Sequence, residues 1–205
     1  TIGGRVYREP ALQIFDWEME TAWQLGRHGG GGHNAFFQHA QLGYTFDTVW
    51  ETRLSFQYDH ASGDDGSADG QFERFDTLFG ARAFELGPTG IYGPLSRSNL
   101  VSPGLRITTT PEQRVGFIGS YRAAWLAEAR DRLIGTGLQD PTGLSGRFLG
   151  HYLDTRVQFR PIHEMLVDFG YSRFLKSTYF DTVPFSPGRV LSSYFFVAVS
   201  LRVVL

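Results

Sequence analysis

The chain has 205 residues and a formal net charge of −2, so it carries no global basic field of the kind that binds nucleic acid or an anionic membrane surface. Its mean hydropathy is −0.20, and no segment approaches the ~18 apolar residues of a transmembrane helix, which excludes a helical membrane protein. A transmembrane β-barrel stays compatible with these values, because only every second residue of each strand faces lipid.

Period-two alternation of apolar and polar residues predicts β-strands along most of the chain. Around residue 55, for example, Leu54 and Phe56 alternate with Arg53, Ser55 and Gln57. In chain order, the nine expected strands are 1–8, 15–25, 35–46, 50–58, 98–109, 115–125, 149–159, 165–175 and 191–203. Most are close to the ~9–11 residues with which a tilted strand crosses a bilayer.

Connection lengths separate a membrane barrel from a soluble β-sandwich, whose strands also alternate. Short connections are expected at 8–11, 46–49, 110–113 and 160–163, and long ones at 26–34, 61–97, 126–146 and 176–189. Tight periplasmic turns and long external loops are typical of outer-membrane barrels. The expected fold class is therefore all-β, an antiparallel up-and-down transmembrane β-barrel surrounded by lipid in the outer membrane of a Gram-negative bacterium.

The number and direction of the strands indicate part of a larger barrel. With the long connections outside, the first strand runs from outside to inside, and nine is an odd number, whereas bacterial single-chain barrels have even numbers of strands. We therefore expect at least one further strand upstream and interpret 1–205 as the C-terminal portion of one barrel domain.

Several segments carry a family resemblance. These are 58–64 (YDHASGD), 75–82 (FDTLFGAR), 87–94 (GPTGIYGP), 120–131 (SYRAAWLAEARD) and 143–148 (GLSGRF). With them, the chain resembles the alginate export family of outer-membrane porins over nearly its whole length. The resemblance implies an 18-stranded barrel, of which this chain would be the second half. It also implies passive export of an anionic polysaccharide through an arginine-rich constriction, by a protein that is not an enzyme.

Strand parity places five arginines on the polar face and away from the turns, and these are the candidate substrate-binding residues of the lumen: Arg5, Arg53, Arg106, Arg122 and Arg156. A guanidinium grips a carboxylate in a bidentate fork, so a series of them forms weak sites for uronates or another anionic solute. The alternative is that the arginines pair with acids of neighbouring strands, namely Glu18, Glu20, Glu51, Asp59 and Asp154, and hold the wall together.

The acidic segment 65–76 fits a calcium-binding loop loosely, with Asp65, Ser67, Asp69 and Asp76 as candidate oxygen ligands near Gly70. A solvated acidic loop is the default interpretation, since no flanking helices are evident, and no other cofactor is expected.

Three further expectations concern the connections. The glycine-rich segment from Gly26 to His33 predicts a flexible loop rather than a two-histidine metal site. Residues 121–133, rich in Ala and Arg, are compatible with a short helix, and 75–99 with an inward-folding gate or a packed cap.

Enzyme motifs such as GxSxG, HExxH or a P-loop do not occur in a suitable context. The remaining alternatives are a porin for small organic acids or sugars, a structural outer-membrane barrel without an open lumen, and a soluble β-sandwich carbohydrate-binding module. Export partners in the periplasm are not identified by the sequence.

Overall fold

The computed structural model describes residues 1–66, 69–77, 86, 95–190 and 192–202. Its elements, in chain order, are β1 (Ile2–Arg8), β2 (Phe15–His28), β3 (Gly31–Thr45), β4 (Arg53–Ala61), β5 (Gln71–Phe72), β6 (Leu100–Glu112), β7 (Val115–Trp125), β8 (Phe148–Ile162), β9 (Met165–Lys176), α1 (Tyr179–Thr182) and β10 (Ser192–Leu201). The nine long strands agree with the nine expected ones, with shifts of a few residues at their ends.

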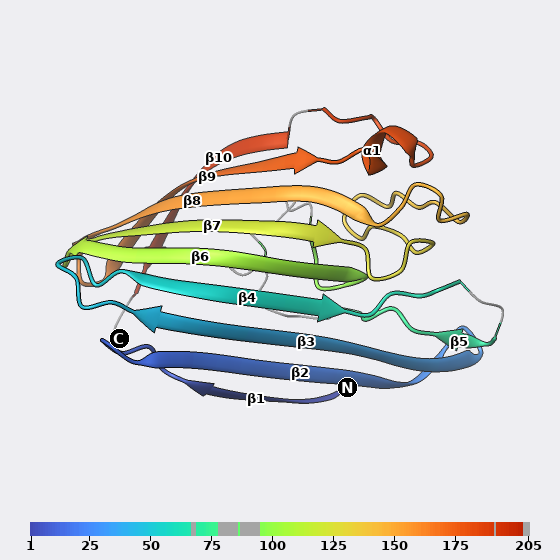
Figure 1. The fold of residues 1–205 in the computed structure, drawn as a ribbon, viewed down its shortest axis with the longest axis horizontal. Helices are drawn as coiled ribbons and strands as arrows, with labels where there is room; N and C mark the ends of the chain where they lie inside the picture. The colour runs from blue at the N-terminus through green and yellow to red at the C-terminus, as the bar shows by residue number, and fades with distance from the viewer. Residues whose placement is uncertain (67–68, 78–85, 87–94, 191, 203–205) are drawn as a thin grey trace.

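The long strands form one curved antiparallel sheet in which each strand pairs with its neighbours in sequence (Figure 1). The order is β1-β2-β3-β4-β6-β7-β8-β9-β10, and the short β5 pairs in parallel with β3. The sheet is not closed, because β1 and β10 lie at its opposite edges. An all-β, up-and-down architecture is thus confirmed, as part of a barrel. Within the described residues, no helix has the length and apolar character needed to cross a membrane.

The connections alternate in length, with one exception to the prediction. The short ones, at 9–14, 46–52, 113–114 and 163–164, lie at what we call the turn end of the sheet. The long ones, at 62–99, 126–147 and 177–191, leave and rejoin the strands at the opposite end, which we call the loop end. The expected flexible loop at 26–34 is wrong. β2 and β3 extend through it and leave a two-residue turn, in which Gly29 and Gly30 have φ of 57° and 91°. Positive φ at both central residues is the geometry of a tight hairpin turn, and glycine adopts it without steric cost.

The two faces of the sheet differ in polarity and exposure. In β4, Leu54 and Phe56 are 48% and 49% exposed, whereas Gln57 and Asp59 are 2% and 1% exposed. We call the buried, polar face the inner face and the exposed, apolar face the outer face. Large exposed apolar residues of the outer face include Trp17, Met19, Trp23, Leu42, Leu54, Phe56, Leu105, Ile107, Phe117, Leu153, Val157, Phe159, Phe169, Phe195, Val197 and Val199. The polarity alternation read from the sequence is therefore the alternation of faces in space.

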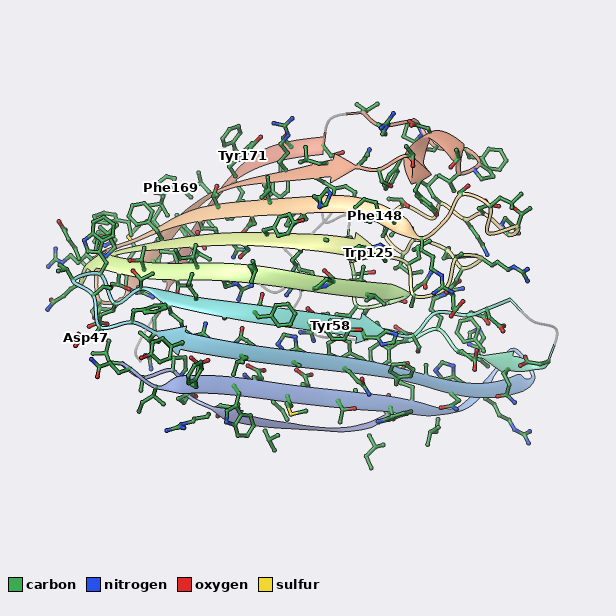
Figure 2. The ribbon with its side chains drawn as sticks, in the orientation of Figure 1. Asp47, Tyr58, Trp125, Phe148, Phe169 and Tyr171 are labelled. Atoms are coloured by element: carbon green, nitrogen blue, oxygen red, sulfur yellow. The ribbon has the colours of Figure 1, made fainter. Side chains whose placement is uncertain are left out.

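Aromatic contacts gather at both ends of the strands. At the loop end, Trp125 packs on Phe148, with ring centroids 5.1 Å apart (Figure 2). At the turn end, Tyr44 contacts Phe15 and Phe46, at 4.8 and 4.9 Å. Aromatic pairs at both ends of the strands are compatible with a sheet that crosses a bilayer, and a further pair, Tyr171 with Phe195 at 4.7 Å, lies nearer mid-strand.

Two local expectations are wrong. The alternation of 149–159 predicts Leu149 on the same outer face as Leu153 and Val157, but Leu149 is fully buried in a core cluster. Trp125 pairs with Phe148 and Ala124 with Gly150, so Leu149 is an extra residue, and this β-bulge turns its side chain inward. The helix expected within 121–133 does not form, because β7 continues to Trp125 and bends and turns follow it.

The apolar core lies toward the loop end, where connections pack on β8 and β9. Its main cluster joins Leu149 and Phe174 of these strands to Leu126 and Leu133 of the 126–147 connection and to Phe180 of α1. Leu86 and Leu95 of the 62–99 connection are buried in the same cluster, whereas most of the proposed gate at 75–99 lies outside the described residues. The described part of that connection therefore contributes packing to the cap of the sheet.

Candidate functional site: arginine–carboxylate pairs on the inner face

Arg53 reaches across a neighbouring strand to an acid. From the start of β4 its Nε donates to Asp16 Oδ2 on β2 at 2.9 Å, and its terminal nitrogen pairs with the second carboxylate oxygen. Gly43 of the intervening strand β3 makes this possible, because a Cβ there would overlap the Arg53 guanidinium and the Asp16 carboxylate. The result is a bidentate ion pair that joins β2 and β4 over β3.

Arg122 of β7 repeats this arrangement further along the sheet. Its NH1 donates to Asp59 Oδ2 on β4 at 2.6 Å and to the Ser102 carbonyl at 3.1 Å, and its NH2 donates to Gln57 Oε1 at 3.0 Å. Asp59 is bonded on its other oxygen to His39 Nδ1 at 2.7 Å. The Arg122 and Asp59 side chains are 2% and 1% exposed, so the pair is a buried element of the wall.

Gly104 provides the space for Arg122. A Cβ at this position of β6 would lie 2.6 Å from Arg122 Cγ and 2.9 Å from the Tyr121 carbonyl oxygen, which is closer than real Cβ contacts come. A glycine on the intervening strand is therefore a shared feature of both cross-strand arginines.

Arg156 of β8 pairs within its own strand. Its Nε donates to Asp154 Oδ2 at 2.8 Å, and Ser172 Oγ on β9 donates to the other Asp154 oxygen at 2.6 Å. Its Cζ lies 5.8 Å from the ring centre of Phe196 on β10, across Gly170 of β9.

The remaining two arginines are more accessible. Arg5 of β1 donates from Nε to Glu18 Oε1 on β2 at 2.6 Å, and its side chain is 53% exposed. Arg106 of β6 is half-buried and donates from Nε to Ser120 Oγ at 3.2 Å. All five arginines of the sequence prediction thus lie on one face, and four of them are bonded to a carboxylate.

The acids partly match the alternative prediction of structural pairing. Glu18, Asp59 and Asp154 are ion-pair partners, and Glu20 lies opposite Arg5 in the strand register. Glu51 belongs instead to the turn before β4, with φ of 45°. Asp16 is a partner that sequence reasoning missed, although it alternates with the apolar Phe15 and Trp17 in the predicted strand 15–25.

A family model described as alginate export matches residues 1–177. The chain belongs to the alginate export family. No curated protein matches the chain.

In this alginate export family member, the inner-face carboxylates balance the arginines. Besides Asp16, Glu18, Asp59 and Asp154, the strands place Glu20 and Asp168 on the same face. The described inner face therefore carries charges of both signs rather than a continuous positive surface.

The calcium loop predicted at 65–76 stays a prediction. Ser67 lies outside the described residues, Asp69 Oδ1 accepts from the Gln71 amide at 2.8 Å, and the Asp76 amide donates to Gln24 Oε1 at 2.8 Å. Among the described residues, no three His, Cys, Asp or Glu side chains form a group that could hold a metal ion. Nearby Glu73 has its pKa raised by burial and by repulsion from acids that include Asp65 and Asp69.

Proposed function

We propose that this chain forms about half of the wall of an outer-membrane channel through which an anionic, alginate-like polysaccharide leaves a Gram-negative cell by passive diffusion. Membership of the alginate export family supports transport rather than catalysis. The observation that carries the proposal is the pair of faces: one exposed and apolar over nine long strands, the other polar and lined with charges. Soluble proteins rarely expose so large a continuous apolar surface, whereas a membrane strand needs one.

Closure of the barrel requires strands beyond these nine. In a bilayer, backbone N–H and C=O groups at an open sheet edge have no water to bond, so spanning sheets close on themselves. β1 and β10 are the free edges of the described sheet. We propose that further strands pair with both of them, because the family resemblance implies a barrel of 18 strands.

We propose that Arg5, Arg53, Arg106, Arg122 and Arg156 act on the solute as a series of weak sites. The more accessible Arg5 and Arg106 contact it. Arg53, Arg122 and Arg156, whose side chains are at most 12% exposed, act only through the weak field of their ion pairs. A uronate carboxylate that approaches a paired arginine competes with its acid partner, so each contact is weak and short-lived. Conduction needs such contacts, because a strong site would trap the polymer. Arg5 has the most accessible ion pair of the four, with its side chain 53% exposed, and is the first to test by mutation.

The test is conductance of the intact protein in planar bilayers. An anion-selective current that polyuronate blocks, and that a neutral polysaccharide of equal length does not, supports the proposal. Current that small organic acids or sugars block, but polyuronate does not, favours a small-solute porin. Absence of current from correctly folded protein contradicts a channel and favours the structural barrel.

A further inference from the structure

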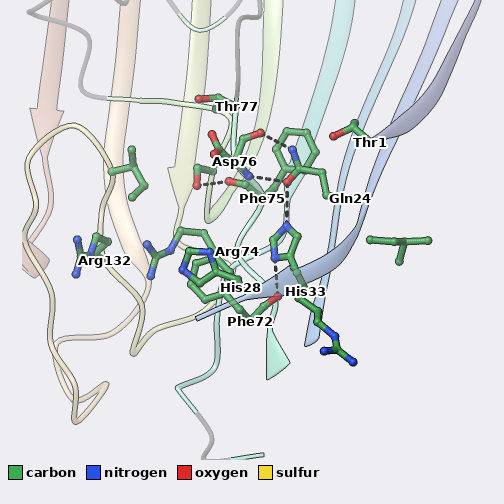
Figure 3. A pocket seen from close by; sticks show the side chains of 14 residues that line it. Thr1, Gln24, His28, His33, Phe72, Arg74, Phe75, Asp76, Thr77 and Arg132 are labelled. Atoms are coloured by element: carbon green, nitrogen blue, oxygen red, sulfur yellow. Dashed lines mark hydrogen bonds between the residues drawn. The ribbon is translucent and has the colours of Figure 1, made fainter. Parts of the chain in front are cut away.

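A cavity of about 660 Å³ lies at the loop end of the inner face, between the β2–β3 hairpin, the segment that follows β5, and the 126–147 connection (Figure 3). Its lining includes His28, His33, Phe72, Arg74, Asp76 and Arg132. The volume falls within the ~300–1,000 Å³ of typical small-ligand sites. None of these residues belongs to the five-arginine set on the strands.

The frame of this cavity is fixed by hydrogen bonds around a buried glutamine. Gln24, 4% exposed, donates from Nε2 to the Asp76 carbonyl at 2.7 Å and accepts from the Asp76 amide at 2.8 Å. His33 Nδ1 donates to the Phe72 carbonyl at 2.9 Å. These bonds hold the segment 72–76 against β2 and β3, so the cavity has a defined shape.

One wall is an aromatic platform. The His28 ring is exposed and lies parallel to Phe72, with centroids 4.2 Å apart and an interplanar angle of 18°. Arg74 Cζ lies 5.1 Å from the Phe72 ring centre, so the guanidinium and the His28 ring both lie beside Phe72 (Figure 3). Flat ring faces beside a guanidinium suit a sugar ring that carries a carboxylate, since the ring can stack while the charge is paired.

The charge of the lining favours an anion. Arg27, Arg74 and Arg132 face the cavity, against one lining acid, Asp76. Arg74 is held by Asp131, to which its Nε donates at 2.8 Å. Arg132 is exposed and, within the part of the chain that the structure describes, its guanidinium has no ion-pair partner. Because Asp131 compensates Arg74, the positive charge of the lining comes from Arg27 and Arg132, against the single lining acid Asp76.

We infer that this cavity is a binding site for one or two residues of an acidic sugar chain at the external mouth of the channel. Arg132, assisted by Arg74, binds the carboxylate, and the exposed face of His28, supported by Phe72, stacks on the sugar ring. The inference deepens the proposed function and rests on it for the identity of the ligand as a polyuronate. Under this inference the cavity retains the polymer as it leaves the channel.

The experiment is isothermal titration of the intact protein in detergent with a uronate trisaccharide and with a neutral trisaccharide. We expect the uronate to bind at least about tenfold more tightly, the factor that one charged hydrogen bond contributes. Arg132→Gln should weaken uronate binding about tenfold for the same reason. His28→Ala should weaken it by roughly three- to tenfold, the range of one ring-stacking contact, and His28→Phe should restore it.

Two matched controls separate the site from general charge effects. Arg130→Gln removes an exposed arginine two positions away that does not line the cavity, and His163→Ala removes an exposed histidine at the turn end. Both should bind the uronate like the wild type. Equal affinity for the two trisaccharides, or equal effects of Arg132→Gln and Arg130→Gln, overturns the inference. Selective binding without conductance contradicts the channel alone, and polyuronate-blocked conductance without trisaccharide binding contradicts this site alone.

Discussion

Replacing Arg122 by methionine should destabilise the protein strongly, because the arginine is a buried partner of Asp59. Methionine has a similar length and no charge, so the change removes the donors and keeps much of the volume. Asp59, 1% exposed, would retain only the bond from His39, and Gln57 Oε1 would lose its 3.0 Å donor. Removing one partner of a buried ion pair costs about 3–5 kcal/mol of unfolding free energy.

Equilibrium unfolding by urea in detergent, followed by tryptophan fluorescence, measures this loss. Arg5→Met is the matched control, because the Arg5 side chain is 53% exposed and its pair with Glu18 should contribute at most about 1 kcal/mol. The double variant Arg122→Met with Asp59→Leu should regain much of the loss, since no buried charge then remains without a partner.

The reasoning is refuted if Arg122→Met and Arg5→Met cost the same, or if the double variant is as unstable as the sum of its single changes. Either result would mean that the buried carboxylate of Asp59 does not depend on the guanidinium. The Arg122–Asp59 pair would then not be an element that stabilises the wall.

Four further changes test other parts of the structure. Gly104→Ala should reduce stability by more than about 1 kcal/mol in the same urea assay, because its Cβ would lie 2.6 Å from Arg122 Cγ. Leu105→Arg, on the outer face, should cost about 2–4 kcal/mol when the protein unfolds from lipid bilayers, and a negligible cost would contradict membrane exposure of that face. Hydrogen bonds from residues of its own loop lower the pKa of Asp140, so its carboxylate stabilises the loop at every pH above the ordinary carboxyl pKa of about 4 and loses this effect only as pH falls through the lower folded value. Asp140→Ala should therefore increase amide hydrogen exchange in the loop at pH 7. Unchanged exchange would refute this role. Glu73 has a raised pKa, so its charged form opposes folding and its contribution to stability should improve as pH falls through the folded value toward the ordinary carboxyl pKa of about 4. Glu73→Gln should make the denaturation midpoint less dependent on pH just above that ordinary value, and an unchanged dependence would contradict this effect.

The positions of the strands and the faces of their residues could be predicted because successive side chains of a β-strand point to opposite faces of the sheet. Leu54 and Phe56 point to one side and Gln57 and Asp59 to the other in sequence and structure alike. The prediction failed at Leu149, where a bulge adds one residue and inverts the parity. The bulge includes Gly150, whose φ is 138°. The chain has 25 glycines, so a glycine at this position does not by itself identify a bulge in the sequence.

The glycine-rich hairpin and the alanine-rich segment were misread for related reasons. Only Gly29 and Gly30 form the turn, whereas Gly31 lies in β3, where a Cβ would overlap the Gly70 backbone. Ala124 is fully buried in the core cluster at the loop end, which indicates close packing rather than helix formation. Small residues in both segments are explained by tertiary contacts that the sequence alone does not display.

The arginines could be placed on a face from the sequence, but their partners could not. Arg53 and Asp16 are 37 positions apart and lie on strands separated by a third, so their pairing depends on the registers of β2, β3 and β4 together. The cavity residues Phe72 and Arg74 belong to a connection whose path is set by Gln24 and Asp76, and no periodicity reports that path.

These differences bear on where selectivity for anions would arise. A guanidinium that is buried and bonded to an acid, as in the Arg122–Asp59 pair, presents little net charge to a polymer, because the two fields largely cancel beyond a few ångströms. An arginine whose guanidinium has no ion-pair partner among the described residues, such as Arg132, keeps more of its field and its donors. If both proposals hold, mutation of Arg132 should change the affinity for polyuronate more than mutation of Arg122, and mutation of Arg122 should change stability more than mutation of Arg132. Measuring polyuronate affinity and stability for both the Arg122 and the Arg132 variant therefore distinguishes two models. In one, the buried ion pairs of the wall select anions, and in the other, the cavity at the external mouth selects them.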